Sequence, residues 1–275
     1  METVDVTDVH KREAQKQWNA TPCGTGDYLA GIEPESLEFF EAVRQSRYER
    51  TDRWMTRTIP FGMAKGKRVL EIGYGMGTDL VSFALAGATE VCGIDITAEH
   101  LRLARRNFEL RNLPCTLKLC DAAAIDFPSE AFDIVYSHGV LHHTPDTVRC
   151  ISEAYRVLKP GGVLIVSLYH TYSLYHLFTM VVVQGVVRSK LRRLGYRGLM
   201  ATVEQGADGV HVKPLVKTYS RRQLRNVLGD FRRVEFKIAH LTSDQVPRLG
   251  RFVPAWVYHA LEPYIGWYVI AFAEK

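Results

Sequence analysis

Three glycines at alternate positions stand in the segment EIGYGMG (residues 71–77), which begins at the end of an apolar run at 68–72. Glycine lets a backbone turn sharply and approach a ligand closely, and in open α/β sheets ligands bind at the carboxyl ends of strands. The dinucleotide fingerprint GxGxxG, counted from Gly73, requires a glycine where this chain has Thr78. The spacing therefore predicts a ligand loop for something other than a dinucleotide.

Two acidic residues follow the next two apolar runs, at 90–94 and 116–119. Asp95 comes about 20 residues after the glycines, where a carboxylate can accept hydrogen bonds from both hydroxyls of a ribose. Asp121 could accept from the amino group of an adenine, or it could instead be the N-cap of a helix. Together the loop and the two acids predict an adenosine pocket.

Two longer motifs complete the pattern. DIVYSHGVLHHTPD (133–146) ends a fourth strand, and RVLKPGGVLIVS (156–167) leads into a fifth through a Pro-Gly-Gly turn. In this order and spacing, over residues 67–168, the segments resemble the class I S-adenosylmethionine-dependent methyltransferases, especially those acting on small molecules. Tyr74 departs from the family, which usually has a small residue there, and we assign it no role.

The resemblance implies S-adenosyl-L-methionine as cofactor and S-adenosyl-L-homocysteine as product. It implies that the glycines line the methionine and ribose, that Asp95 binds ribose and that Asp121 reads the adenine amino group. The cofactor-binding residues implied are Glu71, Gly73, Gly75, Gly77, Asp95, Ile96, Asp121, Ala122, Ser137 and His138.

Methyl transfer from a sulfonium is an in-line displacement, so the enzyme's main task is to align the nucleophile about 3 Å from the methyl carbon. A base is needed only when the nucleophile must lose a proton early. The catalytic candidates are His142, His143, Tyr169 and His170, which follow the fourth and fifth strands; the histidine pair could equally be a packing feature. No clustered carboxylates demand a metal, and we expect none.

Alternating strands and helices must position these residues. Strands are predicted at 68–72, 90–94, 116–119, 132–137, 163–168, 234–239 and 267–273, and helices at 78–86, 98–112 and 146–158. Short apolar strands alternating with helices predict an α/β fold with a parallel, doubly wound sheet. The expected architecture is Rossmann-like and seven-stranded, with a helical N-terminal lid and an insertion after strand five.

Four regions follow from this organisation. Residues 1–66 form the helical lid, which includes an amphipathic helix at 35–53, and 67–168 form the cofactor-binding core. Residues 169–217 form a cap over the acceptor pocket, and 218–275 complete the sheet with a helical insertion at 241–265. The expected lid or substrate residues are Trp18, Tyr28, Arg47, Tyr48 and Tyr172.

Aromatic and apolar side chains fill the segment after the fifth strand, LYHTYSLYHLFTM (168–180). Such a lining favours a hydrophobic or aromatic small-molecule acceptor, methylated at O, N, S or C, although the same stripe could simply be the core of the cap.

The chain of 275 residues is 47% hydrophobic and 24% charged, which is typical of one globular domain. Five scattered cysteines and the absence of an apolar leader predict a cytoplasmic protein.

Two alternatives come from charge. A basic stretch at 188–197 could serve an RNA or protein methyltransferase, but the net charge of +5 is mild, no RNA-binding module is appended, and we do not expect a nucleic-acid partner. The apolar run 174–187 followed by that stretch (together 174–197) could instead contact a membrane surface, which would suit a lipid or quinone methyltransferase. Exposed aromatic residues of the cap would suit a homodimer.

Overall fold

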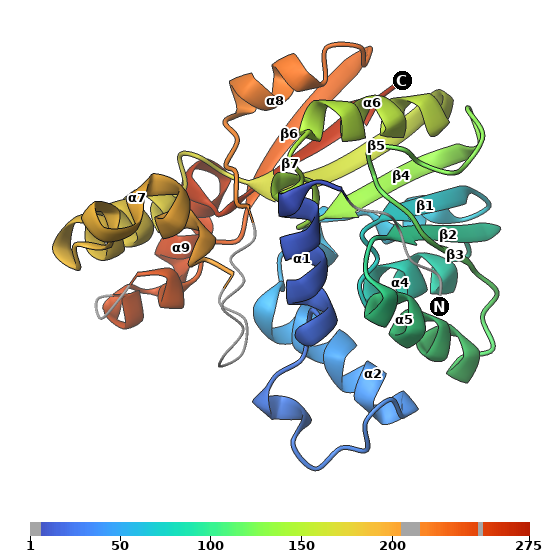
Figure 1. The fold of residues 1–275 in the computed structure, drawn as a ribbon, viewed down its shortest axis with the longest axis horizontal. Coiled ribbons are helices and arrows are strands. Elements are labelled where there is room, and N and C mark those ends of the chain that lie inside the picture. The colour runs from blue at the N-terminus through green and yellow to red at the C-terminus, as the bar shows by residue number, and fades with distance from the viewer. Residues whose placement is uncertain (1–6, 205–214, 247–249) are drawn as a thin grey trace.

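The computed structural model describes residues 7–204, 215–246 and 250–275. Its centre is a seven-stranded sheet in the order β3-β2-β1-β4-β5-β7-β6 (Figure 1). The predicted α/β, Rossmann-like, seven-stranded fold is thereby confirmed. The strands are β1 (Arg68–Ile72), β2 (Glu90–Asp95), β3 (Thr116–Leu119), β4 (Phe132–His138), β5 (Leu158–Tyr169), β6 (Arg233–Ala239) and β7 (Tyr268–Glu274).

Strand direction departs from the parallel arrangement that the sequence predicts. Neighbouring strands among β1 to β5 pair in parallel, whereas β7 runs antiparallel to both β5 and β6. Antiparallel neighbours need no crossover, so the chain leaves β6 and enters β7 at the same end of the strands. The insertion between them, which includes α9 (Ala255–Ile265), therefore begins and ends at the end of the sheet where β1 to β5 have their carboxyl ends.

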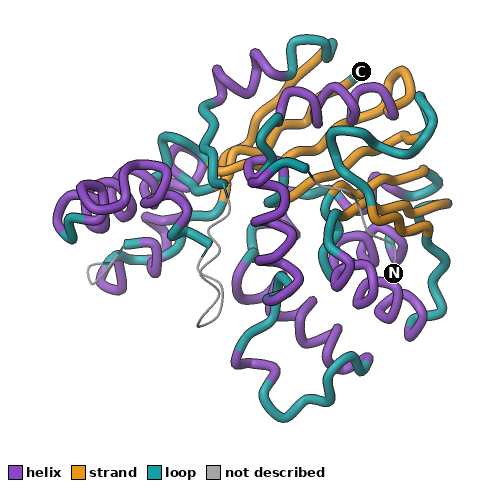
Figure 2. The backbone as a smooth tube through the Cα atoms, viewed as in Figure 1, coloured by secondary structure: helices purple, strands orange, loops and turns teal. Residues whose placement is uncertain are grey.

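Helices cover both faces of the sheet (Figure 2). α4 (Thr78–Leu85) and α5 (Ala98–Leu110) pack on one face, and α6 (Thr147–Val157) and α8 (Arg221–Val227) on the other. Neighbouring strand residues point to opposite faces; thus Val69 joins the core under α4 while Leu70 joins the core under α6. Burial on both faces explains why the strands read as continuous apolar runs.

The N-terminal region is helical but more broken than predicted. α1 (Val9–Ala20) is capped by Asp8, and α2 (Leu37–Gln45) is capped by Ser36 and continues as a π-helical segment (Ser46–Thr51) before α3 (Met55–Thr58). Figure 1 shows α1, in dark blue, at the end of the sheet where β4 and β5 terminate. Gln15 Nε2 donates to the carbonyl of Ile96 at 2.7 Å, which ties α1 to the residue after β2.

The segment after β5 forms a π-helical stretch (Tyr175–Val187) and α7 (Lys190–Ala201), which pack on each other. Met180, Leu199 and Met200 form a small separate core with Tyr169 and Trp267. Within the described ranges, no helix has both the length and the apolarity needed to cross a membrane. Residues 1–6 of the expected lid, 205–214 of the expected cap and 247–249 of the expected insertion lie outside the described residues.

Candidate active site

A cavity of about 270 Å³ lies at the carboxyl ends of the strands, between the sheet and α1. It brings together most of the residues predicted for the cofactor, along with some of those predicted for the acceptor and the lid. The predicted residues that line it are Glu71, Gly73, Gly75, Asp95, Ile96, Asp121, Ala122, His138, Trp18, Arg47, His143 and Tyr169. Segments far apart in the sequence thus share one cavity.

Seven predicted site residues lie outside the cavity lining, namely Gly77, Ser137, His142, His170, Tyr28, Tyr48 and Tyr172. Ser137 donates to the carbonyl of Ile72 and ties β4 to β1, and His170 contacts the carbonyl of Gly266. Tyr28 hydrogen-bonds the carbonyl of Gly24 in its own loop, and Tyr172 is exposed. These contacts give Ser137, His170 and Tyr28 structural partners.

Two positions of the glycine loop require glycine. Gly73 has φ +76°, and a Cβ there would lie 2.3 Å from Cγ2 of Val140. Gly77 has φ +77° at the N-cap of α4 and faces the ring of Phe108 on α5, so it sets helix packing. Tyr74, which the sequence leaves without a role, is buried against Gly93, where a Cβ would lie 2.5 Å from its Cδ1.

Asp95 is held in place from three sides. Its carboxylate accepts from the backbone N–H groups of Gly75 (3.1 Å) and Thr97 (2.9 Å) and contacts His100 Nδ1 at 3.1 Å. Burial opposes ionisation, but His100 and these hydrogen bonds hold the pKa of Asp95 below its ordinary value. The carboxylate is therefore ionised and fixed beside the glycine loop, as a ribose-binding acid must be.

His100 is the partner that the sequence did not reveal. Burial disfavours its charged form, but the Asp95 carboxylate outweighs burial and raises the pKa of His100 to about 10. The ring lies in the first turns of α5 and lines the cavity, and the N–H of Cys23 approaches its Nε2 at 3.4 Å. His100 therefore lies between the ribose candidate and the loop after α1.

Asp121 makes one contact within its own loop and one with α1. One oxygen accepts from the N–H of Ala123 at 2.9 Å, which closes a local turn, while the other pairs with Lys11 of α1. Both Asp121 and Lys11 line the cavity. The acid is therefore available at the cavity wall, next to a cation from the N-terminal helix.

Glu71 presents a buried acceptor without a partner. It is 3% exposed, and within the described part of the chain its Oε2 has no hydrogen-bond partner. Burial, reinforced by Asp79, raises the pKa of Glu71 well above its ordinary value, against the opposing effect of Arg47. A cationic group in the cavity would satisfy this oxygen. The glycine cradle, the fixed Asp95 and this unmet acceptor all fit a cofactor that carries a ribose and an ammonium group.

Arg47 and Tyr48, expected to face cofactor or substrate, converge on Asp79 instead. Arg47 donates to both carboxylate oxygens at 2.9 and 2.7 Å, Tyr48 donates at 2.7 Å, and Tyr136 of β4 donates at 2.9 Å. Asp79 is buried, and these partners keep its pKa below the ordinary value although burial acts to raise it. The network fastens the π-helical segment to α4, and Arg47 still borders the cavity.

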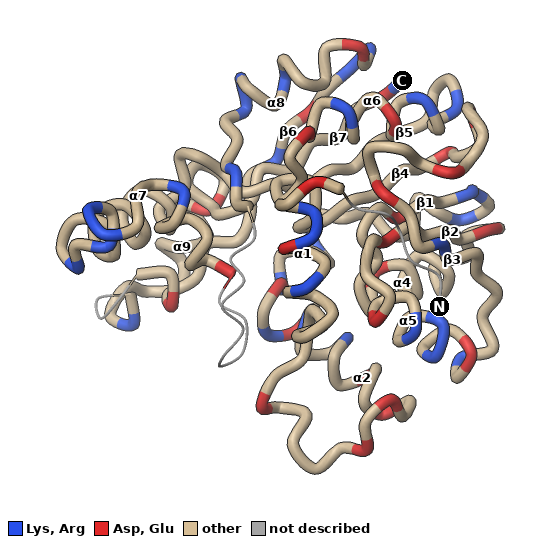
Figure 3. Tube along the Cα trace, in the orientation of Figure 1, with Lys and Arg blue, Asp and Glu red and all other residues tan. Residues whose placement is uncertain are grey.

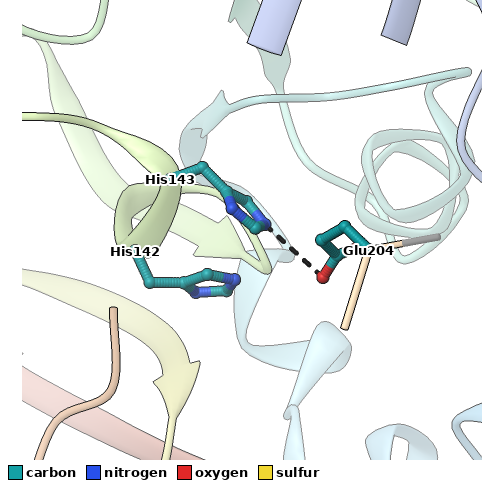
Figure 4. Close-up of side chains that lie close together, drawn as sticks. All are labelled: His142, His143 and Glu204. Carbon is teal, nitrogen blue, oxygen red and sulfur yellow. Dashed lines mark ion pairs between the residues drawn. The ribbon is translucent and has the colours of Figure 1, made fainter. Parts of the chain in front are cut away.

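The cavity is also lined by His143, Tyr169, Glu204 and Tyr268. Tyr169 donates to Glu204, and its ring stacks on Trp267 with centroids 4.2 Å apart. His138 contacts the rings of Trp54 and Tyr268, and burial, together with Arg47, lowers its pKa to about 4. Figure 4 shows His142 and His143 side by side, with Glu204 approaching from the cap.

Sequence reasoning missed several residues of this cavity, among them Lys11, Asp52, Asp79, His100, Glu204 and Tyr268. Asp79 could have been found, because it directly follows the glycine loop, in the first turn of α4. Lys11 and Glu204 carry no local signal, since only the folded chain brings α1 and the end of the cap to the strand ends.

Known proteins resemble the chain over both its core and most of its length. A methyltransferase-domain family model matches residues 70–166. A ubiquinone biosynthesis O-methyltransferase of Psychrobacter cryohalolentis is 31% identical over 235 residues, which is 78% of this chain and 89% of that protein. A demethylmenaquinone methyltransferase of Thermus thermophilus is 36% identical over 116 residues, covering 42% of this chain and 53% of the relative.

The fold has solved counterparts. Geranyl diphosphate C-methyltransferase from Streptomyces coelicolor A3(2), solved with Mg²⁺, geranyl diphosphate and S-adenosyl-L-homocysteine, superimposes with a TM-score of 0.58 at 15% identity, covering 99% of this chain and 100% of that one. At this identity the likeness concerns the fold alone.

Proposed function

The chain belongs to the class I S-adenosylmethionine-dependent methyltransferases, and from that premise we propose that it methylates a hydroxyl oxygen of a small aromatic or hydrophobic molecule. Its cofactor is S-adenosyl-L-methionine. The observation that carries the proposal is that one cavity is lined both by the fixed acidic groups at the strand ends and by aromatic side chains.

The acidic wall is proposed to bind the cofactor. Asp95 would accept from the ribose hydroxyls, and Asp121 would face the adenine between Ile96 and Ala122. Glu71, whose buried Oε2 has no partner, would accept from the ammonium group of the methionine portion. Gly73 and Gly75 leave room for the ligand to approach the backbone, while Gly77 and Ser137 would act on the site through packing and strand pairing.

The aromatic wall is proposed to bind the acceptor. Trp18, Tyr169 and Tyr268 line the cavity and suit a flat, apolar ring. The choice of oxygen is supported by the O-methyltransferase of ubiquinone biosynthesis that matches most of the chain. A quinone precursor is one member of this acceptor class and has no particular support over other aromatic hydroxyl compounds.

The bound cofactor supplies an electrophilic methyl group on a sulfonium. The residues of this chain would bind, orient and desolvate the reactants, because alignment accounts for most of the acceleration in such a displacement. Loss of the acceptor's proton would be assisted at the group formed by His143, Tyr169 and Glu204, in which an imidazole nitrogen lies 3.7 Å from a carboxylate oxygen.

Labelled methyl transfer tests this proposal. The enzyme and S-adenosyl-L-methionine carrying a labelled methyl group are incubated with aromatic hydroxyl compounds and with matched amines and thiols. We expect label on oxygen, and we expect Tyr172→Phe, altered at an exposed residue outside the cavity, to behave as wild type. Label only on the amines or thiols would contradict the oxygen assignment.

We also propose a peripheral contact with anionic membrane surfaces through residues 174–197. Apolar side chains at the end of the π-helical stretch are exposed, with Val186 at 63% and Val187 at 73%. Exposed Arg188, Arg192 and Arg193 follow, and Figure 3 shows basic residues along α7. Apolar residues beside a cationic flank complement an anionic bilayer surface.

Co-sedimentation with vesicles of phosphatidylglycerol and phosphatidylcholine tests the contact. Wild type is expected in the pellet at low salt, and the variant Val187→Asp/Arg192→Glu in the supernatant. A wild-type protein that stays in the supernatant and sediments as a dimer in ultracentrifugation would assign the surface to a second copy of the chain instead.

All five cysteines are free, which supports the cytoplasm as the proposed compartment.

A further inference from the structure

Two histidines and a glutamate lie close together beside the cavity (Figure 4). His142 and His143 lie in a 3-10 turn after β4 (Leu141–His143), and Glu204 follows α7. One ligand atom from each of the three residues can be chosen so that all lie within 4.8 Å of one another. Both histidines are buried and Glu204 is partly buried, so this is not a chance cluster of surface charges.

The hydrogen bonding of His143 leaves two acceptors facing each other. His143 Nδ1 lies 2.7 Å from the carbonyl of Leu215, which can only accept, so Nδ1 carries the proton and Nε2 of the neutral ring carries a lone pair. That Nε2 faces Glu204 Oε1 at 3.7 Å. This separation is too long for a hydrogen bond. Two ligand atoms that bind the same tetrahedral ion, each at about 2.1 Å, lie about 3.4 Å apart, which is close to the separation seen here.

His142 provides the second, independent observation. It is fully buried, with an exposed fraction of 0%, yet neither of its ring nitrogens has a hydrogen-bond partner among the residues that the structure describes. Its ring stacks against Tyr169 with centroids 3.8 Å apart, which fixes its plane. Leaving a buried polar group without a partner is unfavourable, and a coordinated ion would give one of these nitrogens a partner.

The surroundings resemble the outer shell of a metal site. Metal-binding histidines usually donate their other ring N–H to a carbonyl or carboxylate, as His143 does to Leu215, and ligating carboxylates are hydrogen-bonded in turn, as Glu204 is by Tyr169. Two imidazoles and one carboxylate suit divalent transition ions such as Zn²⁺.

We propose that His142, His143 and Glu204 bind a divalent transition-metal ion whose open coordination position faces the acceptor side of the cavity. His143 and Glu204 line the cavity, so that position is reachable from it. The role of the ion rests on the proposed function, whereas its binding does not. An acceptor hydroxyl on the ion would release its proton to water; its oxygen would then bond to the methyl carbon, and the electron pair of the broken S–C bond would stay on sulfur.

Calorimetric titration of chelator-treated enzyme with Zn²⁺ alone tests the site. Wild type is expected to bind one ion per chain, and His143→Ala and Glu204→Gln to bind it at least tenfold more weakly. His259→Ala removes an exposed histidine of α9 and serves as the control. Glu204→Gln keeps the shape of the side chain, so it remains informative if a histidine variant fails to fold.

Cobalt(II) gives a spectroscopic check, because tetrahedral coordination produces strong visible absorption that Glu204→Gln should lose. Absence of zinc binding in wild type, or equal affinity in wild type and Glu204→Gln, overturns the metal site. Binding of S-adenosyl-L-methionine to the metal-free enzyme is measured separately. Its failure would contradict the proposed function whatever zinc does, whereas failure of zinc binding alone leaves methyl transfer in place.

Discussion

At the residue scale, the site depends on buried charges whose partners come from other segments. Asp95 ends β2, and its partner His100 lies on α5, five positions later in the chain. The sequence predicts Asp95 from its position at a strand end. It does not predict His100, because a lone histidine on a helix gives no sign that it turns inward to a carboxylate.

The Asp95–His100 pair predicts a pH dependence of stability. The pKa of His100 in the folded protein, about 10, lies above the ordinary value of 6.5. A raised pKa contributes stability that is fully present below pH 6.5 and is lost as the pH rises through 10. We therefore expect the free energy of unfolding of wild type, minus that of His100→Gln, to be larger at pH 6 than at pH 10.

Urea unfolding of both proteins at the two pH values measures this difference. His259→Gln, altered at an exposed residue, controls for the loss of a histidine as such. A difference between wild type and His100→Gln that does not change with pH would mean that the pair is not ionic.

At the scale of elements, the loop between β1 and α4 combines two constraints that only glycine meets at position 73. Its φ is positive and its Cα faces Val140. Strained backbone of this kind costs about 1–3 kcal/mol for other residues. Gly73→Ala is therefore expected to lower the free energy of unfolding by at least that amount and to weaken cofactor binding.

Gly62→Ala is the matched control, because Gly62 has open space around it and no positive φ. Thermal unfolding and calorimetry with S-adenosyl-L-methionine compare the two variants. Equal behaviour of Gly73→Ala and Gly62→Ala would show that the loop does not need its glycine.

The attachment of the N-terminal segment to α4 gives a second prediction at this scale. Arg47→Ala would leave the buried Asp79 without its cation, and breaking a buried ion pair costs about 3–5 kcal/mol. Adding Asp79→Asn to Arg47→Ala is expected to recover part of this loss, because the unpaired charge is gone. Denaturant unfolding of the two single variants and the double variant gives the coupling; additive effects would contradict an ion pair.

The elements themselves were largely predictable. Apolar runs such as 68–72 and 132–137 are buried on both faces of the sheet, which is why their pattern identifies them. The direction of β7 was not predictable, because an apolar strand has the same pattern in either direction. The π-helical segment Ser46–Thr51 was also missed, since its residues continue the helical pattern of α2.

At the scale of the whole molecule, the cavity exists because the chain returns to the strand ends several times. Lys11 and Asp121 lie 110 positions apart, and α1 reaches the strand ends only in the folded state. No local pattern encodes such contacts, so the sequence predicted the lining residues at the strand ends, such as Asp95, but not those that α1 and the end of the cap bring there, such as Lys11 and Glu204.

Ligand binding should stabilise the whole chain, because the cofactor binds only the folded state. At a concentration 100 times Kd, stabilisation by one bound ligand is about 2.7 kcal/mol. We expect S-adenosyl-L-methionine to raise Tm, and at an equal concentration to raise it much less in Asp95→Ala. An equal rise in both proteins would place the binding site elsewhere.

Calorimetric titration with S-adenosyl-L-methionine tests whether the cavity beside Asp95 binds the cofactor. We expect one site per chain in wild type, and in Asp95→Ala a loss of about 1–3 kcal/mol of binding free energy, the range for a lost hydrogen bond with a charged partner or an unpaired buried group. Asp126→Ala, altered outside the cavity lining, should bind as wild type does. No binding by wild type, or unchanged affinity in Asp95→Ala, would contradict the account.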